Sequence, residues 1–111
     1  MKRCRYRVLL PLFLLAGCDT TVEVNGLLAG EEKLTGSLTH YSDGGTIELF
    51  GGPKTHCVGN FIYNKSAAGP AGSGMMMCDD RRAGPFVFQL SGMTHGVGSG
   101  TLGAQRYTFR F

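Results

Sequence analysis

In the last two thirds of the chain, apolar and polar residues alternate in short runs. Phe86, Phe88 and Leu90 share one face of such a run, and Val87 and Gln89 share the other. A period of two residues is typical of a β-strand with one buried and one wetter face. No window of useful length keeps the 3.6-residue period of an amphipathic helix, so we expect no long helix.

Glycine clusters separate these runs and mark the expected turns, and the 18 glycines and the lack of Trp argue against a helical bundle. The predicted strands are Thr35–His40, Thr46–Phe50, Cys57–Tyr63, Gly74–Cys78, Phe86–Ser91, Gly98–Leu102 and Arg106–Phe111. Asp43-Gly44-Gly45 predicts a hairpin turn, and Ser66–Ser73 is the longest expected loop. The expected fold is all-β: a small antiparallel curved meander or sandwich of about six or seven strands.

The first seventeen residues have the features of a secretory signal peptide. Four basic residues, the last of them Arg7, precede an apolar run from Val8 to Gly17. Ten helical residues rise about 15 Å, half of the roughly 30 Å hydrocarbon core, so this run is too short to span a membrane. A basic start followed by a short apolar stretch is typical of a signal peptide.

The apolar run ends in Leu15-Ala16-Gly17-Cys18, which resembles the lipobox of bacterial lipoproteins. The resemblance implies that Cys18 receives a diacylglyceryl thioether, that the chain is cleaved before Cys18, and that its new amino group is acylated. Two or three acyl chains, at about 0.8 kcal/mol per buried methylene, anchor more firmly than one. Asp19 resembles the signal that retains lipoproteins of enteric bacteria at the periplasmic face of the inner membrane, and the outer membrane is the alternative.

The sequence thus predicts three segments: a signal peptide over 1–17, a lipid anchor and tether over 18–33, and a small β domain over 34–111. Thr21-Val22-Glu23-Val24 alternates weakly. This alternation leaves open that the second segment holds a strand leading into the domain.

Cleavage before Cys18 changes the charge and the cysteine count. The full chain has a net charge of +3, but the 94 remaining residues hold 7 basic and 8 acidic side chains, a net charge of −1. The basic charge therefore gives no argument for a nucleic-acid partner. Cys57 and Cys78 remain as a pair, and an oxidising envelope favours a disulfide between them. Closing its 21-residue loop stabilises the fold by roughly 3 kcal/mol.

A faint repeat covers residues 57–111. Gly59-Asn60-Phe61 and Gly84-Pro85-Phe86 start 25 residues apart, and each precedes a Gly-x-Gly element. This pattern resembles the MORN repeat, whose units pair a Gly-x-aromatic strand with a Gly-x-Gly strand in a hairpin. The family's aromatic-Glu-Gly lead and Asp-Gly turn are replaced by Cys57-Val58-Gly59 and Asp79-Asp80-Arg81. Any meander of Gly-rich hairpins gives similar spacings, so this second interpretation stays open. The stretch from Cys78-Asp79 to Gly84-Pro85-Phe86 is also similar to a small, uncharacterised type of bacterial lipoprotein, which implies no activity.

Met75-Met76-Met77-Cys78, together with His56, Cys57 and His95, offers the thioether, thiolate and imidazole groups that suit copper or zinc. On a strand, however, Met75 and Met77 face away from Met76, and the chain lacks Cys-x-x-Cys and His-x-x-x-His spacings. We favour a buried Met-filled strand and a disulfide, with no metal or other cofactor.

Asp79-Asp80-Arg81-Arg82 is either a recognition tip or a solvated turn that prevents edge-to-edge pairing, and we favour the turn. Gly72-Ser73-Gly74 and Gly98-Ser99-Gly100 are not the Gly-x-Ser-x-Gly elbow of hydrolases. The glycine runs also lack the Lys of a phosphate loop. We therefore expect no enzyme.

The expected function is that of a lipid-anchored envelope protein with a non-enzymatic binding or structural role. Its expected partners are the membrane, through Cys18, and an envelope protein or the cell wall. The alternative is a periplasmic inhibitor or small-ligand-binding lipoprotein, in which 66–73 or 79–82 enters the cleft of a target.

Overall fold

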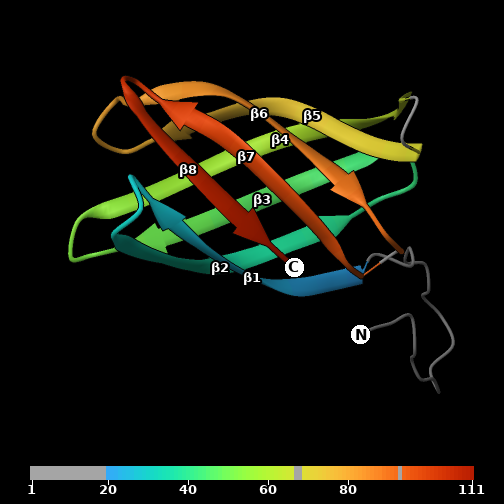
Figure 1. Ribbon diagram of the computed structural model, residues 1–111, viewed down its shortest axis with the longest axis horizontal. Helices are drawn as coiled ribbons and strands as arrows, with labels where there is room; N and C mark the ends of the chain where they lie inside the picture. The colour runs from blue at the N-terminus through green and yellow to red at the C-terminus, as the bar shows by residue number, and fades with distance from the viewer. Residues whose placement is uncertain (1–19, 67–68, 93) are drawn as a thin grey trace, which may run out of the picture.

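The computed structural model describes residues 20–111 apart from 67–68 and 93, and these form eight antiparallel strands closed into a barrel (Figure 1). The strands are β1 (Thr20–Leu28), β2 (Glu32–His40), β3 (Gly44–Gly51), β4 (Thr55–Ser66), β5 (Gly69–Cys78), β6 (Ala83–Leu90), β7 (Gly96–Leu102) and β8 (Gln105–Arg110). Each strand pairs with the next, and β8 pairs with β1 between Asn25↔Arg110 and Leu28↔Tyr107. None of the described residues forms a helix long and apolar enough to cross a membrane.

The all-β antiparallel prediction is confirmed, but the expectation of about six or seven strands in a curved meander or sandwich was wrong, because eight strands close into a barrel. The seven predicted runs correspond to β2 through β8, and β1 is the strand that closes the barrel. Its pattern is weak because only Val24 and Leu28 are fully buried and Gly26 lies between them. Closure leaves no edge strand to protect. The barrel begins at Thr20, inside the segment over 18–33 that was expected to hold the tether.

The predicted loop Ser66–Ser73 was also wrong, because β4 continues to Ser66 and β5 begins at Gly69. Small residues suggested a loop, but here they lie in the β4–β5 ladder, where Tyr63 pairs with Gly72. The hairpin expected at 43–45 is present between β2 and β3. Its two glycines already belong to β3, and the Tyr41 N–H donates to the Gly44 carbonyl at 2.6 Å.

Inward-facing aromatic rings fill the middle of the barrel, and the predicted alternation in β6 is confirmed. The rings, each at most 4% exposed, belong to Phe61, Phe86, Phe88, Tyr107 and Phe109. The centroids of neighbouring rings lie 4.9 to 6.5 Å apart, mostly in edge-to-face contact. Eight strands enclose a space just wide enough for side chains to fill, and the rings occupy it.

Glycines on neighbouring strands make room for these rings. Phe88 pairs with Gly72 on β5 and with Gly98 on β7. A Cβ atom at Gly72 would lie 2.2 Å from the Phe88 ring, and one at Gly98 would lie 2.4 Å from the Phe109 ring. Much of the glycine content therefore serves packing inside the barrel rather than turns.

The predicted disulfide is present between Cys57 on β4 and Cys78 on β5, which lie directly opposite each other in the ladder. Both cysteines face the interior and are 1% and 5% exposed. The disulfide therefore belongs to the core and joins two strands that already pair. Cys18, the predicted lipidation site, lies outside the described residues.

Candidate functional site

A polar cluster lies on the outer surface where β3, β4 and the β5–β6 turn meet. His56 Nε2 lies 2.6 Å from Glu48 Oε2, and His56 Nδ1 lies 3.0 Å from Asp79 Oδ2. The Phe50 ring stacks on the imidazole with 4.7 Å between centroids. We refer to Glu48, Phe50, His56 and Asp79 as the His56 cluster.

The strand register builds this cluster. Phe50 pairs with His56 across the β3–β4 ladder, and Glu48 is two residues from Phe50 on the same outward face. The Asp79 N–H donates to the His56 carbonyl at 2.9 Å, which holds the β5–β6 turn beside β4. Three segments therefore converge on one imidazole.

The two carboxylates decide the charge of the imidazole. Hydrogen bonding to Glu48 first, and then to Asp79, raises the pKa of His56 above its ordinary value of 6.5. The His56 side chain is 34% exposed, so solvent screens the interaction. Because the carboxylates bind opposite edges of the ring, they do not converge on one point.

A second set of polar contacts fixes the turn itself. Arg82 Nε donates to Asp80 Oδ2 at 2.8 Å, and its terminal nitrogens donate to Gln105 Oε1 at 2.8 Å and to Thr55 Oγ1 at 3.3 Å. The hydrogen bond from Arg82 lowers the pKa of the Asp80 carboxyl. Arg81 has a positive φ of 76° and an exposed side chain, which has no polar partner within the described part of the chain. Of the two arginines in this turn, which the sequence analysis favoured as a solvated turn over a recognition tip, Arg82 is engaged in the fold and Arg81 is exposed to solvent.

The residues considered for a copper or zinc site do not come together. Cys57 and Cys78 are joined in the disulfide. The prediction that Met76 faces away from its neighbours is confirmed, since Met76 is fully buried while Met75 is 58% and Met77 is 67% exposed. The expected buried Met-filled strand was therefore wrong for two of its three methionines, because β5 has an interior and an exterior face.

The histidines are also apart. His56 lies beside the β3–β4 turn, whereas His95 lies in the β6–β7 connection at the other end of the barrel, with Nδ1 3.1 Å from Thr94 Oγ1. Among the described residues, no group of three or more His, Cys, Asp or Glu side chains is arranged to hold a metal ion.

Apolar side chains occupy much of the outer face of β4, β5 and β6. Val58 pairs with Met77 across the β4–β5 ladder, and Met75 pairs with Pro85 across the β5–β6 ladder. The large hydrophobic side chains exposed on this face are Val58, Ile62, Met75, Met77 and Val87. The predicted wetter face is thus exposed, but it is not uniformly polar.

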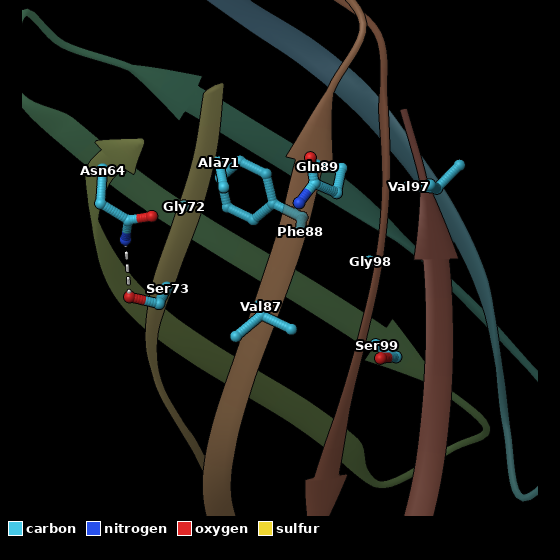
Figure 2. A pocket seen from close by; sticks show the side chains of 10 residues that line it. All are labelled: Asn64, Ala71, Gly72, Ser73, Val87, Phe88, Gln89, Val97, Gly98 and Ser99. Carbon is cyan, nitrogen blue, oxygen red and sulfur yellow. Dashed lines mark hydrogen bonds between the residues drawn. The ribbon is translucent and has the colours of Figure 1, made fainter. Parts of the chain in front are cut away.

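A shallow depression of about 430 Å³ lies beside this face, over β5, β6 and β7 (Figure 2). Val87 pairs with Ser73 on one side and with Ser99 on the other. Asn64 Nδ2 donates to Ser73 Oγ at 3.2 Å (Figure 2). The serines of both Gly-Ser-Gly elements therefore line one depression, but none of its ten lining residues is a histidine.

One buried polar contact and one buried hydroxyl in the barrel interior escaped the sequence analysis. His40 is 2% exposed and hydrogen-bonds through Nδ1 to the Tyr63 hydroxyl, whose pKa burial raises to about 12. Burial also raises the pKa of the Tyr107 hydroxyl, which has no hydrogen-bond partner among the described residues. His40 could have been assigned to the interior because it lies two residues beyond Leu38 on the same face of β2.

The His56 cluster also escaped the sequence analysis, although a signal for it was present. His56 precedes Cys57, and Asp79 follows Cys78. A disulfide between opposite residues of two antiparallel strands brings these two neighbours side by side. Comparison with protein-family models, curated proteins and solved structures finds no match to this chain.

Proposed function

We propose that this chain is a lipid-anchored protein of the bacterial envelope with a non-enzymatic binding or structural role. The observation that carries the proposal is Leu15-Ala16-Gly17-Cys18 at the end of a basic and then apolar segment. Removal of residues 1–17 and acylation of Cys18 are parts of the proposal. Asp19 favours the periplasmic face of the inner membrane over the outer membrane.

The packing of the barrel indicates which surface contacts a partner. Aromatic rings fill the middle of the interior, so binding of a macromolecule falls to the outer surface. The outer surface offers the apolar side chains of β4 to β6 and the His56 cluster beside them. An envelope protein or the cell wall is the partner that this location provides.

The anchor is tested by metabolic labelling with palmitate. The wild-type chain is expected to take up label, whereas Cys18→Ser is expected to remain an unlabelled, uncleaved precursor. Cys4→Ser removes a thiol from the signal peptide and serves as the matched control, with labelling unchanged. Label on the Cys18→Ser chain would overturn the anchor.

A periplasmic inhibitor is the second candidate, and the β5–β6 turn is the observation that favours it. Arg82 and Asp80 fix the backbone of this turn and leave the Arg81 guanidinium available for a carboxylate or phosphate. Adding the purified protein to a cell-wall hydrolase is expected to inhibit the enzyme, and Arg81→Ala is expected to relieve the inhibition. Crosslinking of the anchored protein in cells that captures an envelope assembly, with no effect on the hydrolase, would favour the structural role.

A further inference from the structure

The first described residue fixes which end of the barrel is tied to the anchor. Thr20 begins β1 and pairs with His40, the last residue of β2. The anchored end therefore holds the start of β1 and the β2–β3 connection, together with the β4–β5 and β6–β7 connections, on the right in Figure 1. The other four turns lie at the far end.

The chain between the anchor and the barrel is short. Cys18 and Thr20 are separated by Asp19 alone, so their Cα atoms are at most about 7 Å apart. The polar headgroup layer on each side of a bilayer is itself roughly 5–7 Å thick. Acyl chains on Cys18 that enter the hydrocarbon therefore bring the anchored end of the barrel into contact with the headgroups.

The side chains at the two ends differ in the way that this placement requires. The anchored end carries Tyr41, which is 49% exposed, and Tyr is enriched at membrane interfaces because its ring is apolar and its hydroxyl polar. The charged side chains described in or beside its connections are Asp43, Lys65 and Arg110, the last of which pairs with Val97 at the start of β7. The charged side chains in the far turns and at their margins are Glu31, Glu32, Lys54, Asp79, Asp80, Arg81 and Arg82.

We propose that the barrel stands with this sparsely charged end on the lipid bilayer, that Tyr41 lies among the headgroups, and that the His56 cluster and Arg81 face away from the membrane. The proposal rests on the proposed acylation of Cys18. From Gly44 to Phe50, β3 runs about 20 Å from the bilayer toward the far end, at roughly 3.3 Å per residue. The surface open to an envelope partner is then the far end and the adjoining outer face of β4 to β6.

The absence of Trp from the chain makes the orientation measurable. Tyr41→Trp and Phe50→Trp each introduce one fluorophore at a side chain of matched exposure, 49% and 47%, at opposite ends of β3. Each full-length variant is produced in cells, purified from membranes and reconstituted in vesicles of phosphatidylethanolamine and phosphatidylglycerol. Lipids brominated near the headgroup then quench the Trp that lies among them.

Mass spectrometry of the reconstituted protein first establishes whether Cys18 carries acyl chains. With the acyl chains present, quenching is expected to be several-fold stronger for Tyr41→Trp than for Phe50→Trp, with a blue-shifted emission for Tyr41→Trp alone. Equal quenching, or stronger quenching of Phe50→Trp, on an acylated protein would overturn the orientation and leave the anchor standing. A protein without acyl chains would overturn both proposals.

Discussion

The substitution Gly72→Ala, which adds one methyl group, tests whether glycines on the inner face of the barrel are needed to make room for the aromatic rings. In Gly72→Ala the new Cβ would lie 2.2 to 2.8 Å from Cζ, Cε2 and Cε1 of Phe88, so the ring must move. The Phe88 ring is packed against Phe61, Phe86 and Phe109. Overpacking of this kind costs about 1–3 kcal/mol of unfolding free energy.

The three ring atoms that would meet the methyl group are absent from leucine. Phe88→Leu alone is expected to cost about 1–2 kcal/mol, because it removes buried ring atoms. In the double variant Gly72→Ala/Phe88→Leu, the leucine leaves room for the new methyl group. Its loss of unfolding free energy is therefore expected to be at least 0.5 kcal/mol smaller than the sum of the losses of the two single variants. Equilibrium unfolding in urea, followed by circular dichroism, measures all three variants, and an unchanged slope shows that the unfolding reaction is comparable.

Gly74 on the same strand supplies the control. A Cβ there would lie 1.9 Å from the Asn60 carbonyl oxygen, which is backbone and cannot be trimmed. Phe88→Leu should therefore leave the cost of Gly74→Ala unchanged. Additive costs for the Gly72 pair, or rescue of Gly74→Ala, would refute the explanation of the glycines by ring packing.

Three further predictions concern the disulfide, the His56 cluster and the register of β6. Reducing Cys57–Cys78 should lower the unfolding free energy by roughly 3 kcal/mol in urea titrations, and thiol titration should find no free Cys57 or Cys78 before reduction; an unchanged midpoint after reduction would contradict this. Because the pKa of His56 is raised in the folded protein, its hydrogen bonds to Glu48 and Asp79 should contribute fully to the unfolding free energy below pH 6.5, the pKa in the unfolded chain. This contribution should be lost as the pH rises through the pKa of the folded protein. NMR titration should show a larger fall in that pKa for Glu48→Gln than for Asp79→Asn, and the reverse order would count against Glu48 as the main partner. Phe86→Asp should unfold the barrel, whereas Val87→Asp should cost less than about 1 kcal/mol, and equal losses in thermal melts would show that the register is misassigned.

The strands that sequence predicts well are those with bulky residues at every second position. Phe86 and Phe88 make β6 visible because each inward position is large and each outward neighbour is exposed. The alternation in β1 is hard to recognise in the sequence because Gly26 occupies an inward position. A Cβ atom there would lie 2.2 Å from the Thr108 carbonyl oxygen. A glycine placed for packing cannot be distinguished from a turn glycine by its position in the sequence alone.

The same ambiguity affects the apparent repeat. Phe61 pairs with Gly74 across the β4–β5 ladder, and Phe86 pairs with Gly100 across the β6–β7 ladder. Gly-x-aromatic and Gly-x-Gly spacings therefore have a packing reason in this barrel. The cysteine pair was predictable because the expected cleavage and lipidation would leave Cys57 and Cys78 as the two remaining thiols. Closure was not predictable, since pairing of β1 with β8 leaves no local signal in the sequence.

Closure by the first and last strands sets the order in which this barrel can assemble. Asn25 pairs with Arg110, 85 residues away, while each of the other ladders joins neighbours in the sequence. Hairpins with short loops form quickly, and contacts that span most of the chain form late because loop closure costs more entropy. A ribosome synthesises β1 before β8, so the barrel cannot close until β8 has emerged. Until then β1 is held by β2 alone, and a chain truncated before β8 would present two unpaired edges to its neighbours.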